Sequence, residues 1–134
     1  MFPRCLFIVA ISTVFWACSD LAGSSSDIQG TFQGTFTITH STGVSESGIV
    51  TFTFSGGQYT CTPETQYLPP SGAGLFSRLD RTIWLKDTVA HTAEFDWTLI
   101  LNGAFSVIYD GTHLVLAQND VKYQRHRKIE LTRK

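Results

Sequence analysis

The sequence predicts an all-β protein in which an antiparallel up-and-down meander of about eight strands closes into a small β-barrel. Three observations support this. Apolar and polar residues alternate with a period of two from Gln29 onward. Short turn sequences rich in Gly, Asn and Asp separate the alternating runs. No window after Gln29 shows the apolar spacing of an amphipathic helix. Closure is expected because an open meander would leave strand edges exposed.

The composition fits one compact domain. The chain has 134 residues, of which 43% are hydrophobic and 16% charged, enough apolar content for a packed core. A net charge of −1 removes nucleic acid as the default partner. Six basic residues gather near the end of the chain, which indicates either contact with anionic headgroups or polyanions, or a charged edge strand that resists aggregation. They are Lys122, Arg125, Arg127, Lys128, Arg133 and Lys134.

The N-terminus is typical of a secretory signal. Arg4 precedes an apolar run that ends at Ala17 and is too short to cross a bilayer as a helix. Cys18 follows, and a Ser-rich stretch after it suits a flexible tether. We therefore expect a signal peptide over residues 1–17, a tether over 18–28 and a barrel domain over 29–134. Ordinary secretion with cleavage near Gly23 is the alternative.

This layout resembles a bacterial lipoprotein signal, in which a small residue precedes a cysteine that is diacylated on sulfur and becomes the new N-terminus. The resemblance implies lipidation of Cys18 and a membrane anchor of more than one acyl chain. It also implies a place in the bacterial cell envelope, as an outer membrane lipoprotein that faces the periplasm or the cell surface.

The first half of the barrel domain alternates clearly. Phe32, Phe36 and Ile38 alternate with threonines, as do Val50, Phe52 and Phe54 further along. The sequence Ser55-Gly56-Gly57 predicts a tight turn, and the stretch 63–72, which contains Pro69-Pro70, predicts a loop. Two more short strands are expected over 73–79 and 82–86, with a loop over 87–92.

The region from Ala93 to Leu131 predicts a four-strand meander. Its turns are expected at Asn102-Gly103, where a three-residue bulged loop keeps the apolar residues on one face, at Asp110-Gly111, and at Asn119-Asp120. A two-residue loop at Asp110-Gly111 pairs Val107 with Leu114 and Phe105 with Leu116.

The last predicted turn brings two arginines to the inner face. Carrying the register across Asn119-Asp120 places Tyr123 opposite Leu116 and Arg125 opposite Leu114, and Arg127 then shares their face with Ile129 and Leu131. Charged side chains on an apolar face need partners. We therefore interpret Arg125 and Arg127 either as anchors for an anionic ligand, or as structural arginines that stack on Phe32 or cap strand carbonyls.

Several motifs resemble lipocalins and fatty-acid-binding proteins. Gly30-Thr31-Phe32 resembles the Gly-x-Trp that opens their first strand. Tyr123-x-Arg125-x-Arg127 resembles the cationic motifs late in their barrels, where a lipocalin arginine lies over that Trp. Residues 95–103 are similar to a segment of small lipocalin-like lipoproteins of Bacteroidetes, a family of unassigned function. The resemblance implies a lipocalin-like barrel and binding of a small molecule.

Motifs for catalysis or metal binding are not visible in the sequence. It contains no Gly-x-Ser-x-Gly, and its four histidines are scattered, although the predicted register pairs His113 with His126 on the outer face. We therefore assign no catalytic residue, no metal and no cofactor. If Cys5 leaves with the signal and Cys18 carries lipid, Cys61 has no disulfide partner and is expected in the core.

The predicted function is binding of a small apolar or anionic amphipathic ligand inside the barrel. Phe36, Phe105, Val107 and Tyr109 would line the cavity, and Tyr123, Arg125 and Arg127 would provide its polar anchors. Trp84 and Trp97 fit either a sugar or lipid site or core packing. The alternative function is a structural or protein-interaction module of the envelope without a ligand cavity. The sequence identifies no protein partner.

Overall fold

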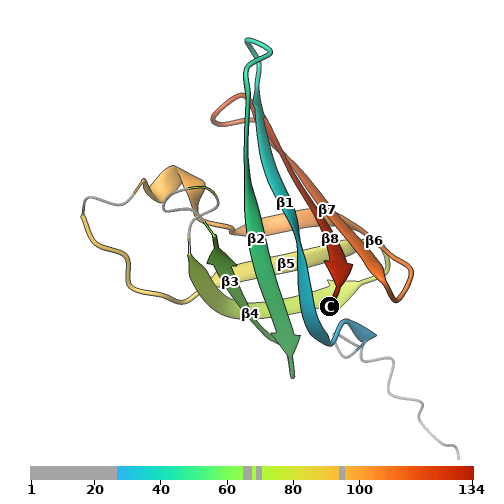
Figure 1. Ribbon diagram of the computed structural model, residues 1–134. Coiled ribbons are helices and arrows are strands. Elements are labelled where there is room, and N and C mark those ends of the chain that lie inside the picture. Colours follow the sequence, from blue (N-terminus) through green and yellow to red (C-terminus); the bar gives the residue numbers. More distant parts are fainter. Residues whose placement is uncertain (1–26, 65–67, 69–70, 94–95) are drawn as a thin grey trace, which may run out of the picture.

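The structure is a computed structural model that describes residues 27–64, 68, 71–93 and 96–134. In this part of the chain, eight antiparallel strands form a closed barrel (Figure 1), which confirms the predicted fold class. The strands are β1 (Gly30–His40), β2 (Ser45–Ser55), β3 (Gln58–Pro63), β4 (Gly72–Leu79), β5 (Thr82–Asp87), β6 (Gly103–Tyr109), β7 (His113–Asp120) and β8 (Arg125–Arg133). One short 3-10 helix, η2 (Trp97–Leu99), lies between β5 and β6.

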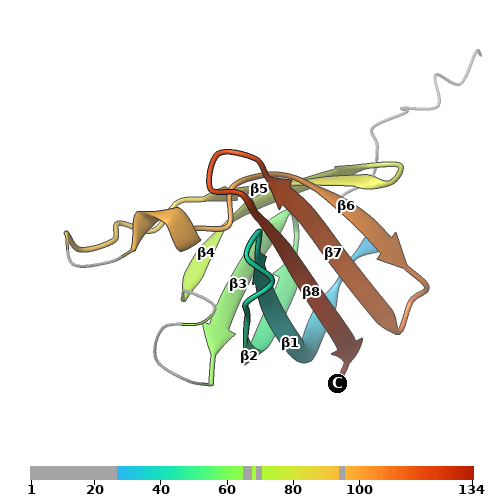
Figure 2. The same cartoon turned by 90° about the horizontal axis from the view of Figure 1, so that it is seen from above.

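Each strand pairs with the next one, and β8 returns to pair with β1. At the point of closure, Phe36 of β1 lies between Gly48 of β2 and Ile129 of β8. Figure 2 shows the resulting ring from above. In the described part of the chain every strand has a partner strand on both sides, so the sheet closes, although residues 45–49 of β2 extend beyond β3.

The two ends of the barrel differ. The connections from β2 to β3, β4 to β5 and β6 to β7 are short turns at one end, which we call the turn end. The four other connections, including the protruding β1–β2 hairpin and the η2 segment, lie at the opposite end, which we call the loop end (Figure 1). Both limits of the described domain lie at the turn end, since Arg133 Nη1 donates to Gln29 O (2.6 Å) and Lys134 N donates to Thr31 O (2.9 Å).

The interior of the barrel is filled. Inward-facing residues alternate along the strands, and the largest of them are at most 1% exposed: Phe32, Phe36, Phe52, Phe54, Tyr59 and Phe105. Their rings pack closely, with 5.7 Å between the centroids of Phe52 and Phe54 and 5.1 Å between those of Phe54 and Phe76. A side chain without accessible surface borders no water-sized space, so these residues form a solid core.

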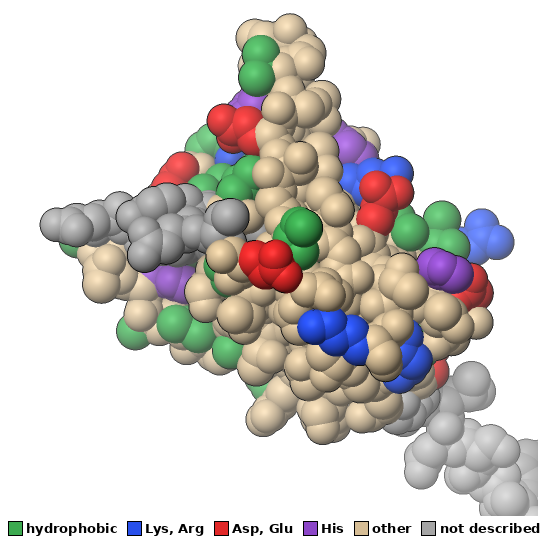
Figure 3. All heavy atoms as spheres, viewed as in Figure 1, with side chains coloured by type: hydrophobic (Ala, Val, Ile, Leu, Met, Phe, Trp, Pro, Cys, Tyr) green, Lys and Arg blue, Asp and Glu red, His purple; other side chains and the backbone are tan. Residues whose placement is uncertain are grey.

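The outer face of β1 and β2 carries the threonines of the alternating pattern. Thr31 and Thr53 lie opposite each other with their hydroxyl oxygens 3.3 Å apart. The space-filling view shows this face as largely free of charged and hydrophobic side chains (Figure 3). The alternation predicted for these two strands is thereby confirmed.

Gly34 lets β1 and β8 approach each other closely. A Cβ atom at this position would lie 1.8 Å from the carbonyl oxygen of Glu130 and 2.9 Å from the Cα atom of Leu131. Neither contact can be relieved by a side-chain movement, because both atoms belong to the backbone of β8. The tight curvature of this small barrel therefore requires glycine here.

The four-strand meander predicted over 93–131 is wrong at its first strand. The η2 helix occupies part of this region, and Asp96 caps it by accepting from Thr98 N (2.9 Å) and Thr98 Oγ1 (2.7 Å). Such local side-chain hydrogen bonds compete with strand pairing. β6 pairs with β5 instead, with Phe105 opposite Ile83, so the bulged hairpin expected at Asn102-Gly103 does not form.

The predicted register between β6 and β7 is wrong by two residues. Val107 pairs with Leu116, and Tyr109 pairs with Leu114. The cause is Asp110, which precedes the turn and accepts hydrogen bonds from the backbone N–H groups of Thr112 (2.8 Å) and His113 (2.6 Å). A shift of two residues keeps every side chain on its predicted face, so the inner face was still identified correctly.

The predicted turn at Asn119-Asp120 is also wrong. Both residues belong to β7, and Asp120 pairs with Arg125 across the ladder. β7 continues to this point because the inward carboxylate meets the arginine of β8. The connection follows over residues 121–124, and Tyr123 lies in it, 42% exposed, rather than opposite Leu116.

Because β7 and β8 are joined by residues 121–124 rather than by a turn at Asn119-Asp120, the cross-strand partners on both faces differ from the predicted ones. Leu114 lies opposite Leu131 rather than Arg125. On the outer face, His113 pairs with Thr132 and His126 with Asn119, so the predicted histidine pair is wrong. The placement of Arg125 and Arg127 on the inner face is confirmed, since they are 8% and 4% exposed.

Candidate functional site

The inner face of β8 becomes charged at the loop end. Arg125 donates from Nε to Asp120 Oδ2 (3.1 Å), and its Nη2 lies at the same distance from that oxygen. Arg127 Nη2 lies 3.8 Å from the same carboxylate. One buried carboxylate therefore serves two buried guanidinium groups, and the trio carries a net charge of +1.

The two arginines also hold the η2 segment against the barrel. Arg125 donates to the side chain and the carbonyl oxygen of Thr98, the former at 3.3 Å. Arg127 donates to Ile100 O (2.9 Å) and to the side-chain oxygen of Gln118. These contacts agree with the interpretation that the arginines cap carbonyl groups, although the carbonyls belong to the η2 segment rather than to a strand.

The other structural interpretation, an arginine stacked on Phe32, involves a different residue. Arg133 lies over the Phe32 ring, with 4.7 Å from its Cζ to the ring centroid, at the turn end. Arg125 lies over Tyr123 at 4.9 Å, and Arg127 over Phe105 at 5.6 Å. Each guanidinium thus lies over an aromatic ring, a contact that planar arginine makes readily.

Arg127 has a lowered pKa in the folded protein. Desolvation and the neighbouring charge of Arg125 lower the pKa of Arg127, while Asp120 acts in the opposite direction. Its Nε is buried without a hydrogen-bond partner in the described part of the chain. The arginine pair is therefore an electrostatically costly arrangement that the fold retains at this end of the barrel.

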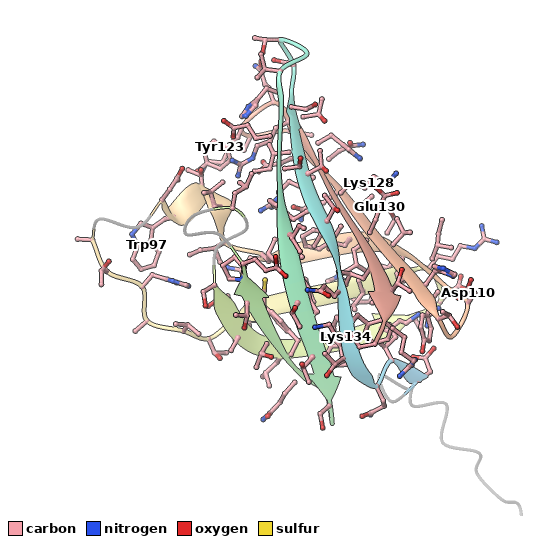
Figure 4. All side chains as sticks on the ribbon, in the orientation of Figure 1. Trp97, Asp110, Tyr123, Lys128, Glu130 and Lys134 are labelled. Carbon is pink, nitrogen blue, oxygen red and sulfur yellow. The ribbon has the colours of Figure 1, made fainter. Side chains whose placement is uncertain are left out.

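One hollow beside the arginines combines aromatic and polar side chains, and we call it the aromatic hollow. Its volume is about 510 Å³, and it lies between the η2 segment, the end of β7 and the β7–β8 connection. Trp97 and Tyr123, which line it, are 54% and 42% exposed. Figure 4 shows both rings on the same flank of the barrel. Asn102, Gln118, Asn119 and Arg127 supply polar groups to its wall.

A second hollow of about 510 Å³ lies between the β1–β2 hairpin and η2, and we call it the hairpin hollow. Its apolar wall is formed by Ile38, Leu68 and Leu99. Its ionisable groups include Arg125 and the pair formed by His40 and Glu46, whose Nε2 and Oε2 atoms lie 3.8 Å apart. The arginine pair therefore separates two open hollows at the loop end.

The structure separates the residues expected to form one site. Phe36, Phe105 and Val107 lie in the solid core, at most 2% exposed. Tyr109 lies toward the turn end, where its hydroxyl accepts a hydrogen bond from Arg133 Nη2 (2.6 Å). Tyr123, Arg125 and Arg127 come together at the loop end, and they line the two hollows.

The sequence pattern did not indicate that Asn102 and Asn119 belong to a site. It predicted both as turn residues, because Asn beside Gly or Asp is a turn signal. Trp97 was considered for a site, but it was placed on a strand rather than in η2. The Asp96-x-Thr98 capping sequence is the signal that could have indicated its position.

The described residues contain no group of three His, Cys, Asp or Glu side chains that could hold a metal ion. They also contain no helix long and apolar enough to cross a membrane. Cys61 is buried as predicted, at 1% exposed, and burial together with the charge of Asp87 raises the pKa of its thiol. Such a thiol is a poor nucleophile because the thiolate is suppressed.

No protein-family model, curated protein or solved structure matches this chain. The resemblance to lipocalin-like lipoproteins therefore rests on the sequence motifs. The eight-stranded closed barrel itself rests on the strand pairing described above.

Proposed function

We propose that this protein is a lipid-anchored protein of the bacterial cell envelope that binds a small ligand at the loop end of its barrel. One observation carries the location: the interior is filled by side chains, whereas two hollows of about 510 Å³ open at the loop end. Small-molecule sites in proteins commonly have volumes of about 300–1,000 Å³.

This proposal moves the predicted site from the interior to the loop end. A ligand inside the barrel would have to displace fully buried rings such as Phe36 and Phe105. At the loop end, a ligand needs no such displacement, and the hydrogen bonds of Arg125 and Arg127 already fix the η2 segment that forms part of both hollows. A preformed wall lowers the entropic cost of binding.

Two features support the lipocalin-like, tethered form of the proposal. Arg133 near the end of β8 covers Phe32 at the start of β1, as the lipocalin resemblance implies for a late arginine and the first-strand aromatic ring. Cys18, the proposed lipid acceptor, lies outside the described residues. Gln29 lies at the turn end, so a tether that precedes it would join the barrel at the end away from both hollows.

Native mass spectrometry of the protein purified from its own host tests the ligand proposal. We expect an additional mass that is lost in Trp97→Ala, which opens the aromatic hollow, or in Ser47→Trp, which fills the hairpin hollow. The core variant Ile83→Val is the matched control and should retain the mass. If both loop-end variants retain the additional mass and the core variant loses it, the ligand binds in the interior of the barrel rather than at the loop end.

A second candidate is a protein-interaction module of the envelope, and two observations favour it. The filled interior is one. The other is a set of apolar side chains on the outer face of neighbouring strands β4, β5 and β6: Leu75, Leu79, Trp84 and Ile108, which are 42–72% exposed. Cross-linking in the host should then capture a protein partner through this face, and Leu79→Asp combined with Ile108→Asp should abolish the capture while Trp97→Ala leaves it unchanged.

A further inference from the structure

The aromatic hollow has two large, partly exposed rings in its wall. Trp97 is 54% exposed and Tyr123 is 42% exposed, and both line the aromatic hollow. Two partly exposed aromatic rings in the wall of one hollow, with polar groups around them, are more typical of a recognition site than of scattered surface residues.

The position of the Trp97 ring is set in advance by its surroundings. The ring of His91 meets it edge to face, with 5.7 Å between the centroids and an interplanar angle of 83°. His91 in turn lies 3.2 Å from Asp87 through Nε2. The next residue, Thr98, is fixed by the Asp96 cap and by Arg125. The indole is therefore held in place before any ligand arrives.

Two side-chain amides in the wall have donors available. Asn102 accepts from Asp87 N through Oδ1 (2.7 Å), and Asn119 Oδ1 lies 2.7 Å from Nδ1 of His126. Within the described residues, the Nδ2 groups of both amides have no hydrogen-bond partner. Gln118 differs, because its Nε2 already donates to the carbonyl oxygens of Asn102 (3.1 Å) and Ala104 (3.2 Å). The oxygen atoms of both amides are thus engaged, and both residues line the aromatic hollow.

We infer that the aromatic hollow binds a short carbohydrate, with Trp97 as the stacking surface and Asn102 and Asn119 as hydroxyl-binding donors; this rests on the proposed function. A pyranose ring has one face of C–H groups, which packs on an indole, and hydroxyls around its edge, which accept from amides. A fatty chain could use the rings but would leave the amide donors desolvated and unpaired. The shallow, open shape also suits the end of a glycan.

Carbohydrate binding can be tested with the full-length protein on an array of neutral and acidic glycans, followed by titration of the best-bound free sugar. Trp97→Ala should lower the affinity at least about tenfold, which corresponds to about 1.4 kcal/mol. Asn119→Ala should lower it roughly three- to tenfold, the effect of one hydrogen bond. Trp84→Ala is the matched control, since Trp84 is 42% exposed but lies on the outer face of β5, and it should leave the affinity unchanged.

The outcomes separate this inference from the proposed function. Equal binding by Trp97→Ala and the unaltered protein would overturn the assigned site. If the array binds nothing and native mass spectrometry finds a lipid held at the loop end, the carbohydrate inference fails and the ligand-binding function stands. If neither a sugar nor any other small molecule is bound, both proposals fail.

Discussion

Arg125 and Arg127 occupy inner-face positions of β8 that continue the apolar series of Ile129 and Leu131. The alternation of the sequence was sufficient to place these four residues on one face. Their partners could not be predicted in the same way, because Thr98 and Ile100 offer backbone carbonyls, and every residue has one. Asp120 could not be predicted as their partner for another reason, since Asn119-Asp120 has the composition of a turn.

The contacts of Arg125 with Asp120 and Thr98 predict that Arg125→Ala strongly lowers the free energy of unfolding. The change leaves the carboxylate of Asp120, whose side chain is 12% exposed, without its principal partner and releases Thr98. Removing one partner of a buried ion pair costs about 3–5 kcal/mol, so we expect the free energy of unfolding to fall by about 3 kcal/mol. Urea denaturation measures it.

The control for this change is Lys128→Ala on the same strand. Lys128 and Glu130 form an exposed ion pair with 2.8 Å between Nζ and Oε1, and both are labelled in Figure 4. An exposed pair contributes about 0–1 kcal/mol. Equal destabilisation by the two substitutions would contradict a structural role for Arg125.

Gly34→Ala should also destabilise the barrel strongly. The new methyl group would meet the backbone of Glu130 and force β1 and β8 apart, so we expect a loss of about 3 kcal/mol in the free energy of unfolding. Gly56→Asn is the comparison, because Gly56 has φ +58° and open space around it, and asparagine tolerates that conformation. Thermal unfolding of both variants decides the point, and an unaltered melting temperature for Gly34→Ala would refute the close approach.

At the scale of elements, strands were predictable where the alternation is long and the turns are tight. β4 and β5 follow the predicted ranges 73–79 and 82–86 closely, whereas the segment before β6 does not form a strand. The apolar residues of that segment suggested a strand, but the Asp96 cap stabilises a helical turn, and Leu101 enters the core at 2% exposed from a non-strand position. Tertiary contact here overrides the local pattern.

The β6–β7 turn should respond to acid. Hydrogen bonds from the backbone N–H groups of His113 and Thr112, and one with the His113 side chain, lower the pKa of Asp110 to about 2. Because the unfolded value is about 3.9, this carboxylate stabilises the fold above that pH, and the contribution is lost as the pH falls through 2. Asp110 stands at this turn in Figure 4.

Asp110→Asn should remove that dependence. Urea midpoints measured between pH 5 and 2 should fall less steeply in the variant than in the unaltered protein over the interval from about pH 4 to 2. Parallel profiles for the two proteins would show that the carboxylate does not have the lowered pKa. An NMR titration of the Asp110 carboxyl carbon measures the same quantity directly.

At the scale of the whole molecule, closure of the barrel could be predicted, because the edge strands of an open meander would lack hydrogen-bond partners. Whether the interior is filled or hollow could not be predicted. A period-two pattern indicates which residues face inward, but it does not tell whether phenylalanines such as Phe52 and Phe54 fill the space or surround a ligand. Ring volume against barrel radius decides this, and the radius depends on the strand register.

The proposed anchor gives a prediction for the full chain. Cys18→Ser should abolish incorporation of labelled palmitate and move the protein from the membrane fraction to the soluble fraction of the host, since stable anchoring needs the lipid. Mass spectrometry of the unaltered protein identifies its mature N-terminus. A chain that begins near Gly23 and carries no palmitate label would establish ordinary secretion instead.

The position of the two domain limits has a consequence for how the protein stands on a surface. The described domain begins and ends at the turn end, and the ten steps from Cys18 to Ile28 span at most roughly 33–36 Å. An acylated Cys18 would therefore keep the turn end within roughly 36 Å of the bilayer, with the loop end and Trp97 on the opposite side of the barrel. We expect a reporter fused after Lys134 to lie nearer the headgroups than a probe inserted in the β1–β2 hairpin.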